Sequence, residues 1–398
     1  MKSLDFKVNG FLFSGISTGI KKDGRRDLGL IYSEVPARIA GLFTTNAVKA
    51  APVLLDLERI RGSLCQALIV NSGNANACTG THGMKDARRV CSLVAKELGI
   101  REKSVFTAST GVIGSPLPMN KIEKRIPELI KALSPEGWMK TVEAIMTTDT
   151  YPKVEVATCL IKGEKVKLCG MVKGAGMIRP DLATMLSFLV TDANLEAPLL
   201  QRMLKKAAED SYNRITVDGE TSTNDTVLLL ANGKAGHPSL SRLDREAEVF
   251  QSMLSEVCLN LAKSVVKDGE GATKLIEVLV QGARSNEDAR QAAYAVAHSP
   301  LVKTAFFGED ANWGRILSAL GHCGAQVDPD RIDIFFDKVP VTRRGMGTGA
   351  QSEQRASRIL KNRSVKVTVD LHQGNNKFSV LTTDLSIEYV KINASYRS

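Results

Sequence analysis

Residues 173–193 read Lys173-Gly-Ala-Gly-Met-Ile-Arg-Pro-Asp-Leu-Ala-Thr184-Met-Leu-Ser-Phe-Leu-Val-Thr-Asp-Ala193. A glycine-rich segment bent by a proline leads straight into the step from Ala183 to Thr184, and an apolar run follows. The glycines can adopt backbone angles that are closed to other residues, and the proline fixes its own φ. Such a loop can hold one peptide bond in a strained geometry. The hydroxyl of Thr184 could then attack the carbonyl carbon of Ala183.

Cleavage of this bond would make Thr184 a new N-terminus with a free α-amine. An α-amine titrates near ~8, close enough to neutrality to take the proton of the same residue's hydroxyl. One residue would then supply both the nucleophile and the general base. The apolar run after it is equally typical of a buried strand or a short core helix, and a glycine-rich approach often marks only a turn. Local chemistry alone leaves both interpretations open.

The composition argues against a membrane or nucleic-acid partner. A chain of 398 residues suits two or three domains, and its 43% hydrophobic content and mean hydropathy of −0.07 are ordinary. The N-terminus lacks an apolar signal-like segment, and no stretch approaches the ~20 apolar residues of a membrane span. The net charge is +10, but the basic residues are dispersed and aromatics are only 5%. This pattern favours a solvated basic surface, and secondarily the steering of small acidic molecules.

The seven cysteines are scattered, without a Cys-x-x-Cys pair or a histidine at zinc-ligand spacing. We therefore expect reduced thiols in a cytoplasmic protein and no metal site. Cys78 lies in a Gly- and Asn-rich stretch, but no His/Asn pattern accompanies it as a catalytic partner.

Hydrophobic periodicity predicts alternating strands and helices, which is typical of a layered α/β architecture. The expected β segments are 28–32, 41–45, 67–70, 105–108, 226–230, 275–281, 332–336, 365–370 and 378–391. The expected helices are 84–98, 119–133, 195–210, 242–263, 286–297 and 313–320. Segments 154–161 and 165–172 are expected to form a hairpin that turns at Gly163. Asp192 or Asn194 is the expected N-cap of the helix from residue 195.

Further motifs follow one another along the chain. They are Thr44-Thr-Asn46 with Ala50-Ala-Pro-Val53, Val70-Asn-Ser-Gly-Asn-Ala-Asn-Ala-Cys-Thr-Gly80, Ser109-Thr-Gly-Val-Ile-Gly114, Thr147-Thr-Asp-Thr-Tyr-Pro-Lys153, Thr216-Val-Asp-Gly-Glu-Thr-Ser-Thr-Asn-Asp225, Asp268-Gly-Glu-Gly-Ala-Thr-Lys274, Asn312-Trp-Gly-Arg315 and Asn393-Ala-Ser-Tyr-Arg-Ser398. With the stretch around residue 184, they resemble the ornithine acetyltransferase family, the bifunctional glutamate N-acetyltransferases of arginine biosynthesis. The matches span nearly the whole chain, so the resemblance is specific.

The resemblance implies a fold and a division of the chain. The family folds as a stacked α/β/β/α sandwich with a smaller C-terminal α/β domain, of the self-cleaving N-terminal-nucleophile type. Cleavage between Ala183 and Thr184 would give an α chain of residues 1–183. In the β chain, residues 184–280 would complete the catalytic domain and residues 281–398 would form the C-terminal domain.

The resemblance also implies roles for individual residues. Thr184 would be the nucleophile, and Thr110 with Gly111 would form the oxyanion hole, although the Ser-Thr-Gly sequence alone equally fits a turn. The implied substrate contacts are Thr147, Lys173, Thr184, Glu270, Asn393 and Ser398. The lysine suits a substrate carboxylate, the glutamate suits an ammonium group, and the last two residues would close the pocket. The stretches 71–77 and 312–315 are expected to be structural.

The implied activity is acetyl transfer. The Thr184 hydroxyl would take the acetyl group of N2-acetylornithine, ornithine would leave, and glutamate would then attack the acetyl-enzyme in a ping-pong exchange. No metal or organic cofactor is implied, and the sequence leaves open whether acetyl-CoA is a second acetyl donor. The α and β chains would stay together and pair into an α2β2 heterotetramer.

Two other functions fit the same residues. An aminopeptidase or amidase with an N-terminal threonine would hydrolyse the acyl-enzyme, whereas an unprocessed binding protein would stay one chain and bind its ligand without turnover. The chain also departs from the usual family pattern at Arg179 and Asp181, which place two charges close to the scissile bond. These charges leave the reacting atoms in place but could alter the cleavage rate.

Overall fold

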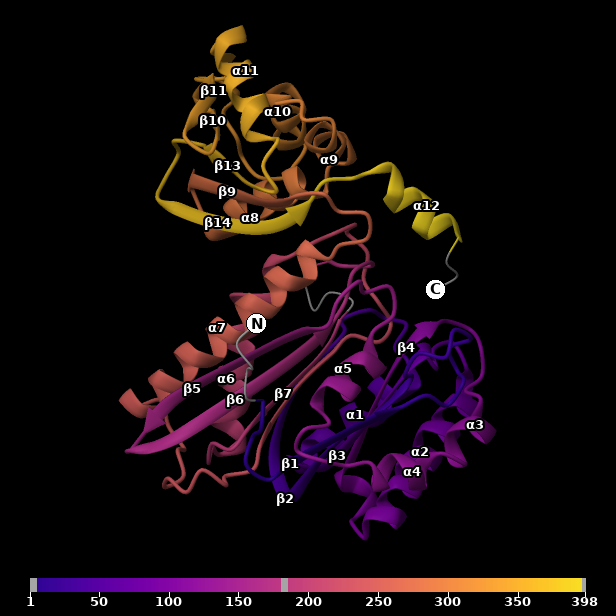
Figure 1. The fold of residues 1–398 in the computed structure, drawn as a ribbon. Coiled ribbons are helices and arrows are strands. Elements are labelled where there is room, and N and C mark those ends of the chain that lie inside the picture. Colours follow the sequence, from indigo (N-terminus) through magenta and orange to yellow (C-terminus); the bar gives the residue numbers. More distant parts are fainter. Residues whose placement is uncertain (1–5, 180–184, 396–398) are drawn as a thin grey trace.

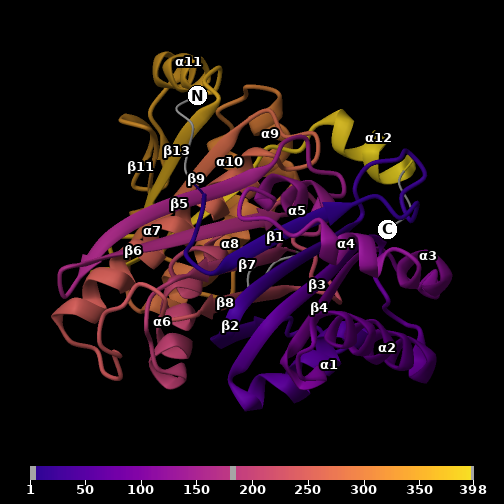
Figure 2. The same cartoon turned by 60° about the horizontal axis from the view of Figure 1, so that its bottom comes forward.

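The computed structural model describes residues 6–179 and 185–395. Their strands and helices form two bodies, each with its own β-sheet (Figure 1). The first body extends to the end of α7 (Arg245–Lys267), and the second begins at β9 (Leu275–Ala283). The last helix, α12 (Ile387–Ser395), leaves the second body and extends back towards the first, as Figures 1 and 2 show.

The first sheet is organised by its longest strand, β2 (Leu28–Phe43). One half of β2 pairs with β1 and the other half with β8, while β3 pairs along its opposite edge. The strand order is β4-β3-β2-β8-β7-β6-β5, with β1 beside β2. The other strands are β1 (Phe11–Ile16), β3 (Leu64–Asn74), β4 (Val105–Val112), β5 (Lys153–Ile161), β6 (Glu164–Lys173), β7 (Leu186–Thr191) and β8 (Thr226–Ala231).

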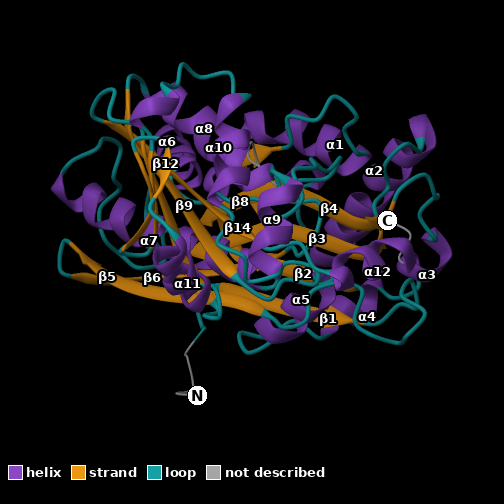
Figure 3. Ribbon diagram, turned by 90° about the horizontal axis from the view of Figure 1, so that it is seen from above, coloured by secondary structure: helices purple, strands orange, loops and turns teal. Residues whose placement is uncertain are grey.

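Alternating apolar side chains along these strands create three separate cores, and the cores define four layers. One core, which includes Leu229, lies between β5–β8 and the helices α6 and α7. Another, which includes Ile69, lies between β2–β4 and the helices α2 and α4. The third lies between the two groups of strands and contains the alternate residues, such as Leu68 and Leu228. The sheet therefore folds over on itself at β2, and the predicted α/β/β/α order is confirmed. Figure 3 shows the strands and helices of both bodies from above.

Capping residues mark the start of one helix and the end of another in the first body. Asp244 caps α7 by accepting from the N–H of Ala247, and α2 ends at Gly99, which takes a left-handed conformation. The remaining helices are α1 (Ala51–Arg59), α2 (Gly80–Leu98), α3 (Met119–Glu123), α4 (Ile126–Lys131), α5 (Trp138–Ile145) and α6 (Ala197–Glu209), with 3₁₀ turns at Ile60–Gly62, Glu102–Ser104 and Tyr212–Arg214.

The second body is a six-stranded sheet of order β12-β11-β10-β13-β9-β14. Its core packs the apolar faces of α8, α9 and α10 against the strands. The strands after β9 are β10 (Asp333–Phe336), β11 (Val339–Arg343), β12 (Met346–Gly347), β13 (Ser364–Asp370) and β14 (Asn376–Thr383). The helices are α8 (Asn286–His298), α9 (Pro300–Phe307), α10 (Trp313–Gly321) and α11 (Ala350–Ile359), with a 3₁₀ turn at Pro329–Arg331.

The structure corrects several predicted elements. The two strands predicted at 28–32 and 41–45 are one strand, β2, because the chain between them stays extended. The helix predicted over 119–133 is split into α3 and α4, because Pro127 lacks an N–H and lies in the first turn of a new helix. The β structure predicted up to residue 391 is wrong beyond β14. There Ser386 Oγ accepts from the N–H of Tyr389 at the start of α12.

Local pairing explains two further outcomes. The predicted hairpin is confirmed as β5–β6, with Ile161 paired to Glu164 across the turn. The predicted N-caps of α6 are wrong, because Glu196 occupies the cap position and Asp192 instead accepts from the N–H of Lys167. Among the described helices, none has the length and apolar character needed to cross a membrane.

Truncation of a core leucine tests the layer assignment. Leu229 is fully buried beneath α6 and α7, whereas Leu160 on the edge strand β5 is 65% exposed. We expect Leu229→Ala to lower the free energy of unfolding by about 2–5 kcal/mol, because it leaves a cavity in a packed layer. Leu160→Ala is the matched control and should change it by less than about 0.5 kcal/mol. Urea denaturation measures both, and equal losses would contradict the assigned layers.

Candidate active site

Six of the predicted site residues line a single pocket where α12 meets the first body. They are Thr110, Gly111, Thr147, Lys173, Glu270 and Asn393. The remaining lining consists of Ala75, Ile113, Thr148, Gly176, Met177, Ser222 and Asn224. The pocket is partly open to solvent. Folding therefore brings together residues from motifs that are far apart in the sequence, and small-molecule sites are typically concave in this way.

The end of β4 supplies one wall of this pocket. Gly111 pairs with Gly73 of β3 and has a φ of +131°. A Cβ atom on Gly111 would lie 2.4 Å from the carbonyl carbon of Gly73, so this position requires glycine. The close approach of the two strands places the Gly111 backbone and the adjacent buried Thr110 on the pocket wall. A backbone N–H and a hydroxyl are the types of donor that stabilise an oxyanion.

Asparagine side chains hold this wall in position. Ser109 Oγ donates to Asn71 Oδ1 at 2.6 Å. Asn224 Nδ2 donates to the carbonyl oxygens of Ser109 and Ala75, at 2.8 and 2.7 Å. All these groups are buried, so water does not compete for the hydrogen bonds. The stretch from residue 71 is thus structural, as expected, and residues 71–74 belong to β3.

A buried lysine links the segments on the opposite side of the pocket. The side chain of Lys153 is fully buried, and its Nζ lies 2.6 Å from Asp149 Oδ1 and 2.5 Å from Asp268 Oδ2. Asp268 also accepts from the N–H and the hydroxyl of Thr150. Two buried carboxylates therefore share one buried cation, and further hydrogen bonds satisfy their remaining lone pairs.

This network fixes the backbone beside three pocket residues. Asp149 accepts from the N–H of Thr147 at 2.9 Å and from the N–H of Gly174 at 2.8 Å. Gly174 follows Lys173 directly, and the second carboxylate of the network lies two residues before Glu270. Thr147, Lys173 and Glu270 are therefore positioned relative to one another by a single cluster of charges.

The charges also affect one another's titration. Burial alone would raise the pKa of Asp149, but the charges of Lys153 and Lys173 together with hydrogen bonds outweigh it, and the pKa lies below its usual value. Lys173 is only 4% exposed, and burial lowers its pKa, although Asp149, Asp225 and Glu270 oppose this effect. A buried cation on a pocket wall is suited to pairing with a carboxylate ligand.

The glycine-rich segment approaches Glu270 closely. A Cβ atom on Gly176 would lie 2.5 Å from the carboxyl group of Glu270, so a side chain there would displace this carboxyl group from its position. The N–H of Glu270 donates to the carbonyl of Ala175 at 2.8 Å. From α12, Asn393 Nδ2 donates to Glu270 Oε2 at 2.8 Å. The carboxylate is thus held between the loop that precedes the predicted cleavage site and the C-terminal helix.

The same loop is fixed a few residues further on. Asp218 accepts from the N–H groups of Met177 and Ile178, at 2.7 and 2.9 Å. It also accepts from the hydroxyl of Tyr389 on α12, at 3.2 Å. Ala183, Thr184 and Ser398 lie outside the described residues, as does Asp181. The first described residue after the predicted cleavage site is Met185, whose N–H donates to Asp225 Oδ1 at 3.1 Å.

Sequence reasoning missed the supporting residues of the site. Asn224 and Asp225 lie in a motif that was recognised without a role, and Lys153 lies in another. For Asn224 and Asp225 the signal is a run of polar residues directly before the fully buried strand β8, because such residues are buried with the strand and need partners. The partners themselves lie far away in sequence, so the sequence does not reveal them.

Arg179, one of the two departures from the family pattern, is exposed and lines a separate hollow with Tyr294 and His298. Burial lowers the pKa of His298 to about 4, and the charges of Arg179 and Lys303 act in the same direction. The charge of Arg179 is therefore directed towards α8 of the second body. Its effect on cleavage stays a prediction.

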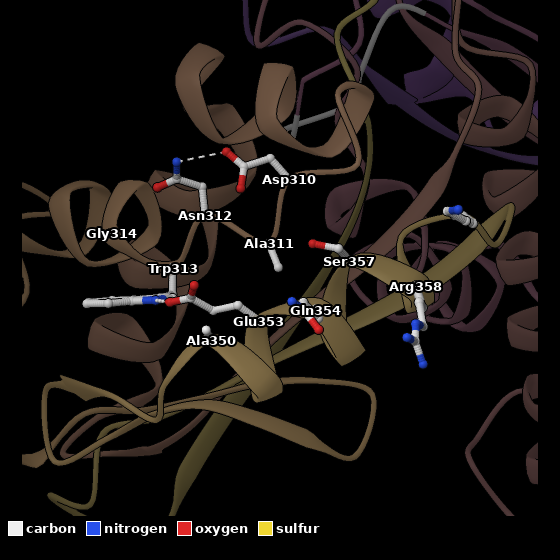
Figure 4. A pocket seen from close by; sticks show the side chains of 11 residues that line it. Asp310, Ala311, Asn312, Trp313, Gly314, Ala350, Glu353, Gln354, Ser357 and Arg358 are labelled. Atoms are coloured by element: carbon white, nitrogen blue, oxygen red, sulfur yellow. Dashed lines mark hydrogen bonds between the residues drawn. The ribbon is translucent and has the colours of Figure 1, made fainter.

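A larger hollow lies in the second body, between α10 and α11, and contains none of the six predicted site residues (Figure 4). Asn312 caps α10, and Trp313 Nε1 donates to Glu353 of α11 at 2.8 Å. Arg315 donates to the carbonyl of Leu301 on α9. The motif at 312–315 therefore joins three helices, which is the structural role expected for it. Within the described part of the chain, no group of His, Cys, Asp or Glu side chains is arranged to hold a metal ion.

The sequence is similar to those of known proteins over nearly its full length. The ArgJ family model matches residues 12–398. The arginine biosynthesis bifunctional protein ArgJ of Geobacter sulfurreducens is 54% identical over 391 residues, which cover 98% of this chain and 100% of that protein. The protein of the same name from Thermotoga neapolitana is 47% identical over 400 residues, covering 99% of this chain and 100% of that protein.

This chain belongs to the ArgJ family. Two solved structures are also similar. A chain of the ArgJ protein from Bacillus halodurans is 43% identical, with 52% of this chain and 96% of that chain covered and a TM-score of 0.49. A chain of the Mycobacterium tuberculosis ornithine acetyltransferase, complexed with ornithine, is 32% identical. The match covers 47% of this chain and 98% of that chain, with a TM-score of 0.40. The matches over nearly the whole sequence confirm the resemblance to the ArgJ family that the motifs indicate.

Removal of the central lysine tests the charge network of this ArgJ-family chain. We expect Lys153→Met to lower the free energy of unfolding at pH 7 by about 3–5 kcal/mol, because two buried carboxylates lose their cation. Lys206→Met removes an exposed lysine from its ion pair with Asp210 and should cost less than about 1 kcal/mol. Urea denaturation compares the two variants, and equal losses would contradict the role of Lys153.

The loss should depend on pH in a defined direction. In the wild type the pKa of Asp149 is lowered, so its contribution to stability is present above the unfolded value of about 3.9 and is lost as the pH falls through the folded value. Without Lys153, the two carboxyl groups are easier to bury when they are protonated than when they are charged. Lowering the pH therefore stabilises the folded state of the variant. The deficit of Lys153→Met relative to wild type should therefore be smaller at pH 5 than at pH 8.

Proposed function

We propose that this ArgJ-family chain is an acetyltransferase of arginine biosynthesis that moves the acetyl group from N2-acetylornithine to glutamate. The observation that supports it is the pocket in which Thr110, Gly111, Thr147, Lys173 and Glu270 meet. This pocket combines oxyanion donors, a buried cation and a carboxylate. An acetylated diamino acid presents the matching groups, namely an acyl carbonyl, a carboxylate and an ammonium group.

The proposed enzyme is first activated by cleavage between Ala183 and Thr184. The hydroxyl of Thr184 adds to the carbonyl carbon of Ala183, and the C–N bond breaks as the nitrogen takes the hydroxyl proton. Water then splits the resulting ester. The products are an α chain that ends in the carboxylate of Ala183 and a β chain that begins with the free amine and hydroxyl of Thr184.

The transfer then uses the new N-terminus. The amine of Thr184 accepts the proton of its own hydroxyl as the oxygen attacks the acetyl carbonyl. Thr110 and Gly111 donate to the oxyanion, and each such donor contributes about 3 kcal/mol in the transition state. Ornithine leaves with the proton, and the acetyl group stays on Thr184. The amine of glutamate then attacks the ester, which yields N-acetylglutamate and restores the hydroxyl.

The remaining pocket residues bind and orient the substrate. Lys173 pairs with its carboxylate, Glu270 with the distal ammonium group of ornithine, and Thr147 offers a hydroxyl. Asn393 supports Glu270 through the hydrogen bond from α12. Ser398, outside the described residues, is proposed to close the pocket.

We further propose that the two chains stay associated after cleavage and pair into an α2β2 heterotetramer in the cytoplasm. The association of α with β is supported by the sheet, because β6 and β7 flank the cleavage site and are hydrogen-bonded neighbours from Leu168–Thr191 to Lys173–Leu186. Breaking the connection between paired strands leaves their ladder intact. The acyl transfer itself requires no metal or organic cofactor, and acetyl-CoA is a candidate second donor to be tested in the same assay.

Intact mass under denaturing conditions tests the cleavage. We expect the wild type to give two fragments split between Ala183 and Thr184, and Thr184→Ala to give one chain, because it lacks the attacking hydroxyl. Ser187→Ala is a matched control that removes a buried hydroxyl hydrogen-bonded to Tyr212 of the 3₁₀ turn Tyr212–Arg214, and it should still be cleaved. A wild type that stays one chain would favour the unprocessed binding protein instead.

Steady-state kinetics test the transfer. A ping-pong exchange gives parallel double-reciprocal lines for N2-acetylornithine and glutamate, and incubation with N2-acetylornithine alone should add the mass of one acetyl group to the β chain. Intersecting lines with no trapped acetyl-enzyme would refute the mechanism. Release of acetate rather than N-acetylglutamate would identify the hydrolase alternative.

A further inference from the structure

In the described part of the chain, only one oxygen of the buried Asp225 carboxylate has a hydrogen-bond partner. Asp225 precedes β8 and is 1% exposed. Its Oδ1 accepts from the N–H of Met185 at 3.1 Å, but its Oδ2 has no hydrogen-bond partner in the described part of the chain. Buried polar atoms are nearly always paired, so an unpaired carboxylate oxygen calls for an explanation.

Covalent geometry places this carboxylate close to the reacting nitrogen. The backbone nitrogen of Thr184 is three bonds away from that of Met185, so the two atoms are at most about 3.7 Å apart in any conformation. Cleavage converts the Thr184 nitrogen from an amide with one hydrogen into an amine that carries up to three. The hydrogen bond from Met185 to Asp225 thus brings an acceptor to the neighbourhood where new donors are created.

We propose that Asp225 is a positioning residue that receives the α-amino group of Thr184 on its free oxygen after cleavage. This inference rests on the proposed function, because it requires a cleaved chain with Thr184 at its N-terminus. Asp225 itself neither gains nor loses a proton in the net transfer. The proton moves from the hydroxyl to the amine and then to the leaving nitrogen, while the carboxylate orients the amine and stabilises its protonated form.

The surroundings of Asp225 are consistent with this role. Burial raises the pKa of the Asp225 carboxyl, while the charge of Lys173 and three nearby donors, the N–H groups of Met185 and Ser222 and the hydroxyl of Thr44, act against it. Lys173 in turn lies near Asp149 and Glu270. The amine therefore forms in a region with one nearby lysine, which disfavours its protonation, and the carboxylates of Asp225 and Glu270, which favour it.

The experiment compares the cleaved wild type with Asp225→Asn. The amide keeps one oxygen for the N–H of Met185 but replaces the acceptor Oδ2 by a donor. Without the carboxylate the amine loses a proton more easily, so its pKa falls. We expect the acid limb of the pH profile of kcat/KM for N2-acetylornithine to move down by about one unit. We also expect kcat to fall at least about tenfold, because the amine is no longer oriented.

A second readout reports on the amine directly. The pH dependence of acetic anhydride labelling at the Thr184 N-terminus, followed by mass spectrometry, should show the same downward shift in Asp225→Asn. Asp225→Glu restores a carboxylate and should return both profiles towards the wild type. Asp333→Asn is the control, because it removes a buried, ion-paired carboxylate from the second body and should leave both profiles unchanged.

Wild-type profiles in Asp225→Asn would overturn the inference, as would equal shifts in Asp225→Asn and Asp225→Glu. If Asp225→Asn is not cleaved, residues 1–183 are co-expressed with a chain that begins Met-Thr184, whose initiator Met is removed, and the wild type made in the same way is the reference. A wild type that fails to cleave or to transfer acetyl contradicts the proposed function itself. If the wild type is cleaved and active but the two pH profiles of Asp225→Asn match those of the wild type, only the role of Asp225 is contradicted.

Discussion

The contact of Lys153 with Asp149 and Asp268 is the constraint on which the site depends. A lysine with no solvent exposure is stable only beside compensating charge, and here the two carboxylates come from positions 4 and 115 residues away. Both partners must therefore be in place in the folded state. Because Asp149 also accepts hydrogen bonds from the backbone N–H groups of Thr147 and Gly174, the requirement to pair one buried cation fixes the geometry of the candidate pocket.

Close packing of the backbone at two glycines also shapes the pocket. On one side of the pocket, Gly111 lies so near Gly73 that no side chain fits between the two strands, and asparagines bind the adjoining carbonyls. On the other, Gly176 leaves room for Glu270, which α12 holds through Asn393. The pocket thus depends on both bodies, since its first wall belongs to the four-layer sandwich and its last contact comes from the C-terminal helix.

Much of the fold follows from periodicity along the chain. The β5–β6 hairpin, β8, α7 and α8 were predictable because their apolar spacing and turn residues act locally. The failures occur where local signals compete. Pro127 divides a continuous helical pattern into α3 and α4, and the alternation after Ser386 resembles a strand although a serine cap starts a helix. The folding of the sheet at β2 is a property of three cores and cannot be read from any one segment.

The sequence by itself determined the family, the layer order and the residue types of the candidate site, because motifs in the family's order contain residues suited to a nucleophile, oxyanion donors and charged contacts. Only the tertiary structure decided that Thr110, Lys173 and Glu270 line the same pocket. It alone also revealed the partners of Lys153 and the free oxygen of Asp225. The physical reason is that burial and hydrogen bonding are properties of neighbours in space, and these neighbours are separated by many residues along the chain.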